Sequence, residues 1–96
     1  MRLQNKAAII SGAASGMGAS TAKIFTNEGA KVLVTDMLED EGAAVAAEIT
    51  AAGGTAQFQR LNVTSETDWD SAVAAALAAF GKLDILINNA GISGAQ

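Results

Sequence analysis

Three glycines in the stretch Ser11–Gly18 have a spacing that lets a protein backbone approach a ligand closely: Gly12, Gly16 and Gly18. The apolar run Lys6–Ser11 before them predicts a buried strand, and Met17–Glu28 after them has the spacing of a helix. The first N–H groups of a helix have no partner within the helix, and the helix dipole adds positive charge at the same end. We therefore expect this strand-to-helix turn to bind a phosphate group.

A carboxylate, Asp36, ends the next predicted strand, Lys31–Asp36, twenty residues beyond Gly16. An acidic side chain at this point can accept hydrogen bonds from the ribose hydroxyls of a dinucleotide, and it repels a 2′-phosphate. The glycine motif alone is weak evidence, but glycines between a strand and a helix, followed by this acid, favour a dinucleotide site. The alternative is that Asp36 is only a solvated carboxylate at a strand end.

Helices and strands alternate along the rest of the chain. A helix over Glu39–Ala52 precedes a more polar strand over Thr55–Val63, a candidate sheet edge, and an apolar fourth strand spans Leu83–Asn88. Thr64 and Ser65 are candidate N-caps of the helix between these strands, and with Ser65 as the cap Asp68 would complete a weak capping box. Residues that recur at helical spacing indicate three helices: Met17, Thr21, Ile24 and Phe25, then Val45 and Ile49, then Trp69, Val73, Leu77 and Phe80, the last four on one helical face. The predicted helices end at Gly29, Gly53-Gly54 and Gly81.

The predicted order β-α-β-α-β-α-β, with short connections, implies right-handed crossovers and a parallel sheet. The fold class is therefore α/β: a partial, doubly wound sheet of the Rossmann type with strand order 3-2-1-4, forming part of a single domain over residues 1–96. In this order the ligand crevice opens at the carboxyl ends of the first and fourth strands. Residues 12–18 and 88–91 lie at those two ends.

Composition excludes several other functions. The net charge is −4 and the six Lys and Arg are scattered, so we expect no nucleic-acid partner. The chain has no His and no Cys, which removes disulfides, imidazole bases and the usual zinc ligands, and we expect no metal site. No apolar run is long enough to cross a membrane, and Ala7–Ile10 is too short for the core of a signal peptide. We therefore expect a cytoplasmic protein.

Two further motifs complete a family pattern. Asn62-Val63 and the tetrad Asn88-Asn89-Ala90-Gly91, together with Gly12-x-x-x-Gly16-x-Gly18 and Asp36, resemble the N-terminal half of a short-chain dehydrogenase/reductase. The resemblance covers essentially all of the chain. It implies an NAD(H)-dependent oxidoreductase that interconverts an alcohol and a ketone by hydride transfer, with a small-molecule substrate and a homo-oligomeric complete enzyme.

The resemblance also implies which residues bind NAD. Gly12, Ser15, Gly16 and Met17 would line the pyrophosphate and the nearby ribose, Asp36 would select NAD, Asn62 and Val63 would flank the adenine, and Asn89, Ala90 and Gly91 would contact the nicotinamide-side ribose. Ser11 stands where the family usually has Thr and keeps a hydroxyl able to bond the loop backbone. Asn62 stands where Asp is commoner, and its amide oxygen can still accept the adenine amino group. We expect Asn88 to be structural, and Trp69 and Phe80 to be core residues.

The family's catalytic Ser, Tyr-x-x-x-Lys pair and assisting Asn all follow the N-N-A-G tetrad. This chain has no tyrosine at all, so we assign no catalytic residue and expect the cofactor-binding segment of a longer enzyme. A non-catalytic dinucleotide-binding or regulatory module is the alternative, since a fold alone does not establish activity. A sugar-nucleotide epimerase or dehydratase is disfavoured by the glycine spacing. Because the apolar fourth strand would be a sheet edge, we expect the isolated chain to aggregate or to be marginally folded.

Overall fold

The computed structural model describes residues 2–89, which form seven elements in the expected alternation. They are β1 (Ala7–Ser11), α1 (Gly16–Asn27), β2 (Lys31–Asp36), α2 (Glu39–Ala51), β3 (Thr55–Arg60), α3 (Glu66–Phe80) and β4 (Ile85–Asn88). Two strands are shorter than expected: β3 ends at Arg60 rather than Val63, and β4 begins at Ile85 rather than Leu83. Residues 61–65 are therefore a loop at the carboxyl end of β3.

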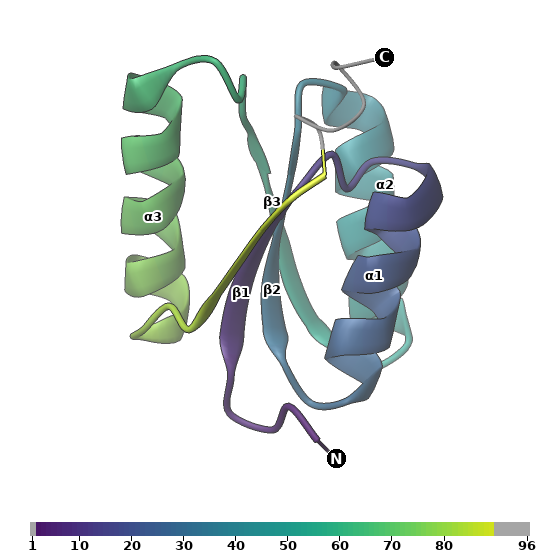
Figure 1. Ribbon diagram of the computed structural model, residues 1–96. Coiled ribbons are helices and arrows are strands. Elements are labelled where there is room, and N and C mark those ends of the chain that lie inside the picture. The colour runs from purple at the N-terminus through teal and green to yellow at the C-terminus, as the bar shows by residue number, and fades with distance from the viewer. Residues whose placement is uncertain (1, 90–96) are drawn as a thin grey trace.

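The four strands form one parallel sheet in the order β3-β2-β1-β4, which confirms the expected doubly wound, Rossmann-type topology. Helices α1 and α2 cover one face of the sheet and α3 covers the other (Figure 1). The register pairs Ser11 with Asn88 and Asp36 with Arg60 at the ends of the strands. The carboxyl ends of all four strands thus meet at one edge of the sheet.

The core lies on both faces of the two central strands. Every residue of β1 is buried, as are the four inner residues of β2, which is the pattern of parallel strands covered on both sides. Alternate residues such as Ile10 and Val34 pack against α1 and α2, while Ile9 and Leu33 pack toward α3. The expected core packing of Trp69 and Phe80 against the sheet is confirmed, and Val45 and Ile49 of α2 are also buried.

The large apolar residues at helical spacing are not all buried. Met17 and Ile24 of α1 are 77% and 61% exposed, and Leu77 of α3 is 47% exposed. The buried positions are instead small residues: Gly18 and Ala22 in α1, and Ala72 and Ala76, with Phe80, in α3. Small side chains let a helix backbone approach the sheet closely, so the larger apolar side chains on these helices are left outside the contact.

The two outer strands differ from the central pair. On β3 no residue is fully buried, and exposed and half-buried positions are mixed, as expected of a polar edge strand. On β4, Leu86 is 55% exposed, and Ile85 and Ile87 are only half-buried. Within residues 2–89, β4 is therefore an apolar edge strand, as the sequence predicted. No helix in this part of the chain is long and apolar enough to span a membrane.

Candidate functional site

The glycine loop between β1 and α1 is packed against the protein at Gly18 and open to solvent at Gly16. Gly12 and Gly16 have φ values of 63° and 60°, a conformation that glycine adopts at little cost. A Cβ on Gly18 would clash with the carbonyl oxygen of Gly12, so the start of α1 lies directly against the loop. A Cβ on Gly16 would meet no atom within 4 Å. The backbone at Gly16 therefore faces open space.

The amino terminus of α1 lacks the negative charges found on the other two helices. The first turn of α2 contains Glu39, Asp40 and Glu41 and that of α3 contains Glu66 and Asp68, whereas the first turn of α1 contains no acidic residue. Its N-cap residue, Ser15, is extended and exposed, and its side chain makes no capping hydrogen bond. Carboxylates neutralise the positive end of a helix dipole, so α1 alone of the three offers an uncompensated anion site.

Asp36 is held by hydrogen bonds to both of its carboxylate oxygens. Ala14 N donates to Oδ2 at 3.0 Å, and Leu38 N donates to Oδ1 at 3.0 Å. Asp36 is partly buried at the end of β2. It is therefore not simply a solvated carboxylate, because it joins the glycine loop to the start of α2.

The loop that contains Asn62 and Val63 is organised by hydrogen bonds to the start of α3. Asn62 N donates to Asp68 Oδ2 at 2.8 Å, and Trp69 Nε1 donates to the carbonyl oxygen of Val63 at 2.9 Å. Ser65 is confirmed as the N-cap, because its side chain accepts from Asp68 N at 3.1 Å. Only this half of the expected capping box forms, because the Asp68 carboxylate accepts from the Asn62 N–H rather than from the Ser65 N–H.

The amide oxygen of Asn62 already has two donors. Thr64 N and Thr64 Oγ1 donate to Asn62 Oδ1 at 3.0 and 2.7 Å. The sequence suggested that this oxygen accepts a hydrogen bond from an adenine amino group. It would first have to lose the hydrogen bond from the Thr64 hydroxyl. The roles of Thr64 and Asp68 in shaping this loop are absent from the sequence prediction, although Asp68 carried a signal as a first-turn acid.

Side-chain hydrogen bonds connect the ends of the three strands β2, β1 and β4. Thr35 Oγ1 donates to the Ile10 carbonyl oxygen at 2.9 Å. Ser11 Oγ donates to Asn88 Oδ1 at 2.7 Å, with the Ile87 carbonyl oxygen at 3.3 Å. The structural role expected of Asn88 is confirmed. The sequence suggested that the Ser11 hydroxyl could bond the glycine-loop backbone. It bonds β4 instead, because the register places Ser11 opposite Asn88.

Asn89 follows directly at this edge. Its Nδ2 is buried and has no hydrogen-bond partner in the described part of the chain. A buried donor without a partner is rare and calls for an acceptor. Ala90 and Gly91, the other two residues expected on the nicotinamide side, lie outside the described residues.

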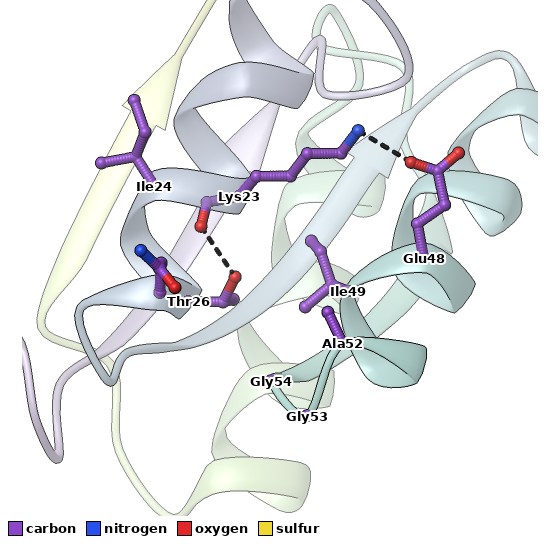
Figure 2. A pocket seen from close by; sticks show the side chains of 9 residues that line it. Lys23, Ile24, Thr26, Glu48, Ile49, Ala52, Gly53 and Gly54 are labelled. Atoms are coloured by element: carbon purple, nitrogen blue, oxygen red, sulfur yellow. Dashed lines mark hydrogen bonds and ion pairs between the residues drawn. The ribbon is translucent and has the colours of Figure 1, made fainter.

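A hollow of about 580 Å³ lies away from all of these groups (Figure 2). It is formed by the carboxyl-terminal parts of α1 and α2, at the far end of α1 from the glycine loop, and includes the exposed Ile24. Lys23 Nζ and Glu48 Oε1 form an ion pair of 2.7 Å across it, with both side chains more than half exposed. It contains none of the expected site residues. Residues 2–89 also contain no cluster of acidic side chains able to hold a metal ion.

Comparison with known proteins relates this arrangement to dehydrogenases. The chain is 54% identical over 91 residues to a 2,5-dichloro-2,5-cyclohexadiene-1,4-diol dehydrogenase of Sphingobium indicum, covering 95% of this chain and 36% of that protein. It is 50% identical over 97 residues to a trans-4-hydroxycyclohexanecarboxylate dehydrogenase of Sinomonas cyclohexanicum, covering 95% and 38%. A 3-alpha-(or 20-beta)-hydroxysteroid dehydrogenase of Mycobacterium tuberculosis is 50% identical over 91 residues, covering 95% and 34%.

A solved structure, that of a hydroxysteroid dehydrogenase from Escherichia coli, superposes with a TM-score of 0.88 and 40% sequence identity. The match covers 91% of this chain and 37% of that one, so this chain spans little more than a third of the length of such relatives. Residues 6–96 match the short chain dehydrogenase family. The open glycine loop at the start of α1, the acid at the end of β2 and these matches lead to one conclusion: the chain belongs to the short chain dehydrogenase family.

Proposed function

We propose that residues 1–96 bind NAD(H) within a longer enzyme that interconverts an alcohol and a ketone by hydride transfer. The observation that carries the proposal is the amino terminus of α1, which has no carboxylate of its own and adjoins the open backbone at Gly16. A dinucleotide pyrophosphate is an anion that fits such a site.

The residues at this edge fit such a cofactor. The absence of any atom near a Cβ on Gly16 leaves room for close approach of a phosphate to the backbone. Among residues 2–89 the buried Asn89 Nδ2 has no acceptor, and a ribose hydroxyl could supply one. The proposed binding residues are Gly12, Ser15, Gly16 and Met17 at the pyrophosphate, Asn62 and Val63 at the adenine, and Asn89, Ala90 and Gly91 at the nicotinamide-side ribose.

Charge favours NAD over NADP at the adenosine end. Asp36 would accept hydrogen bonds from the ribose hydroxyls and repel a 2′-phosphate. Arg60, the Cα partner of Asp36 at the end of β3, lies 3.5 Å from Asp68 and 4.0 Å from Glu39, so part of its charge is already compensated.

The cofactor and the residues of this chain have different roles in the proposed reaction. The nicotinamide of the bound cofactor carries the hydride, while the residues of this chain bind and orient the cofactor. The relatives named above are, by their names, dehydrogenases of a cyclohexadiene diol, a hydroxycyclohexanecarboxylate and a hydroxysteroid. We extend the proposal to a secondary alcohol on a carbocyclic ring as substrate, and to a homo-oligomeric complete enzyme in the cytoplasm.

Calorimetric titration of the complete enzyme with NADH and NADPH, followed by a turnover assay with ring-borne alcohols, tests the proposal. We expect tighter binding of NADH and NAD-dependent oxidation. Tighter binding of NADPH would contradict the role given to Asp36. Binding of NADH by a protein that turns over no alcohol or ketone would instead favour a dinucleotide-binding regulatory module.

A further inference from the structure

The two oxygens of the Asp36 carboxylate hold different parts of the chain. The bond from Leu38 N spans two residues and closes the turn that leads into α2. The bond from Ala14 N joins residues 22 apart in the sequence and reaches into the glycine loop. Asp36 therefore fastens the glycine loop to the carboxyl end of β2.

The strand to which the loop is fastened is itself firmly held. Ala13 N donates to the Thr35 carbonyl oxygen at 3.0 Å, next to the Ala14 bond. The Thr35 side chain is fully buried and donates to the Ile10 carbonyl oxygen at 2.9 Å, tying β2 to β1. Ala14 is only 7% exposed, so loss of the carboxylate would leave a largely buried N–H without an acceptor.

The carboxylate retains acceptor capacity beyond these two bonds. A carboxylate offers about four acceptor positions, and two of those on Asp36 are filled by Ala14 N and Leu38 N. The remainder suffice for the two neighbouring hydroxyls of a ribose. Binding of the ribose therefore does not require release of the glycine loop.

We propose that Asp36 is a positioning residue for the glycine loop as well as the residue that recognises the ribose. One carboxylate then places the backbone that binds phosphate and selects the nucleotide, so the two subsites are coupled. This inference deepens the proposed function and rests on it for the identity of the ligand. It implies that substitution of Asp36 weakens the binding of ligands that have no adenosine at all.

The substitution Asp36→Asn separates the two roles. Its single amide oxygen can still accept from Leu38 N in an Asx turn, but its NH₂ group then faces the N–H of Ala14, donor against donor. The loop loses its anchor, while the side chain can still form a hydrogen bond with a ribose hydroxyl. Asp40→Asn is the matched control, because Asp40 lies in the first turn of α2, is exposed, and its side chain has no hydrogen bond or ion pair within residues 2–89.

The experiment compares both variants with the wild type as complete enzymes. Hydrogen exchange of the segment 11–17 is measured without ligand, and calorimetry gives the affinities for NADH and for reduced nicotinamide mononucleotide, which lacks adenosine. In Asp36→Asn we expect exchange at Ala13 and Ala14 to rise about tenfold and affinity for the mononucleotide to fall about tenfold. Asp40→Asn should match the wild type in both.

Two results would overturn the inference. Unchanged exchange in the segment 11–17 would mean that the carboxylate does not anchor the loop. Unchanged mononucleotide affinity beside a weakened NADH affinity would mean that Asp36 serves the ribose alone. Exchange within β1 and β2 verifies that the variant is folded; if it is not, Asp36→Ser, which keeps a short acceptor for Leu38 N but cannot reach Ala14 N, takes its place. Failure of the wild type to bind NADH would contradict the proposed function. The exchange measurement needs no ligand and would still show whether Asp36 holds the glycine loop in place.

Discussion

Gly16 and Gly18 lie two residues apart and meet opposite steric conditions. Gly16 adjoins open space, whereas Gly18 is pressed against the carbonyl group of Gly12. The sequence alone predicts that glycines are needed in this loop, but it does not say which of them faces the ligand and which faces the protein. That distinction depends on how closely α1 approaches the loop.

The substitution Gly18→Ala should therefore displace the loop. We expect the affinity for NADH to fall about a hundredfold, since a shift of about 1 Å in a positioned group can have an effect of this size. Gly53→Ala is the control: Gly53 has φ of 95° and open space around it, far from the loop, so the substitution costs about 1–2 kcal/mol of stability but leaves NADH affinity unchanged. Calorimetric titration and thermal unfolding measure the two effects. Wild-type affinity in Gly18→Ala would contradict this account of the loop.

Asp84 gives a pH-dependent contribution to stability. The Ala7 N–H, which donates to Asp84 Oδ2 at 2.9 Å, is the main cause of a lowered pKa for this carboxyl, and it outweighs the partial burial that acts in the other direction. The charge of Lys82, 3.3 Å away, lowers the pKa further. Because the folded-state pKa lies below the unfolded value, the stabilisation is present above about pH 4 and is lost as the pH falls through the folded-state pKa.

We expect Asp84→Asn to lower the free energy of unfolding at pH 7 and to have progressively less effect below about pH 4. Urea unfolding of both proteins across this pH range measures the difference. Asp70→Asn is the control, because Asp70 is exposed on α3 and its side chain has no hydrogen bond or ion pair in the described part of the chain. A destabilisation by Asp84→Asn that is constant down to pH 2 would show that the charge of Asp84 is not what matters.

At the scale of residues, the sequence did not predict hydrogen bonds between side chains and residues far away in the chain. The importance of Asp36 follows from its position after the second strand, but its bond to Ala14 depends on the path of the loop. The Ser11 hydroxyl was expected to bond its own loop, and the strand register turned it to Asn88 instead. Local spacing predicts residue types at a site, whereas the choice of partner depends on tertiary geometry.

At the scale of elements, the amino terminus of α1 combines two opposing requirements. A carboxylate in its first turn would stabilise the helix by about 0.3–1 kcal/mol, yet it would occupy or repel the place of an anionic ligand. Met17 lies in this turn and is 77% exposed, so a substitution there changes charge with little effect on packing.

We expect Met17→Glu to raise the thermal stability of the free protein while lowering its affinity for NADH about tenfold. Met17→Gln, of similar size and without charge, is the matched control. The difference between the two variants should shrink as salt is added, since exposed charges are screened. Calorimetric titrations at low and high salt provide the measurement, and an equal loss of affinity in both variants would assign the effect to the side chain rather than to its charge.

The elements themselves were largely predictable, and the helix faces less so. The glycines that end the helices and the β-branched runs of the central strands give clear signals for element type and order. Helical spacing alone does not predict which positions are buried. Ile24 and Leu77 are exposed, because close contact between helix and sheet favours the small residues Ala22, Ala72 and Ala76. The relative closeness of two elements is not encoded in the periodicity of either one.

At the scale of the whole molecule, the fold class and strand order follow from the alternation of elements and the handedness of crossovers. The same reasoning predicted that the fourth strand lies at an edge, and within residues 2–89 β4 is the last strand of the sheet, with Leu86 55% exposed. Exposed apolar edge strands promote association between chains, because their N–H and C=O groups can pair with another strand.

We expect the isolated 96-residue chain to self-associate through β4, and Leu86→Lys to reduce that association. Leu77→Lys is the control, since Leu77 is similarly exposed but lies on α3 rather than on the sheet edge. Sedimentation velocity over a range of concentrations distinguishes them. A monodisperse wild-type monomer that melts cooperatively would contradict the expectation.

The bond between Trp69 and the Val63 carbonyl group has an optical consequence. Trp69 is the only tryptophan of these 96 residues, and its indole N–H is fixed to the loop proposed to flank the adenine. Emission from an indole responds to a change in its hydrogen bonding and surroundings, so a ligand that moves this loop should change the fluorescence spectrum of Trp69. The absorbance of a reduced nicotinamide, in contrast, reports on the nicotinamide end of the proposed cofactor. Tryptophan fluorescence and nicotinamide absorbance would thus follow the two halves of the proposed dinucleotide separately.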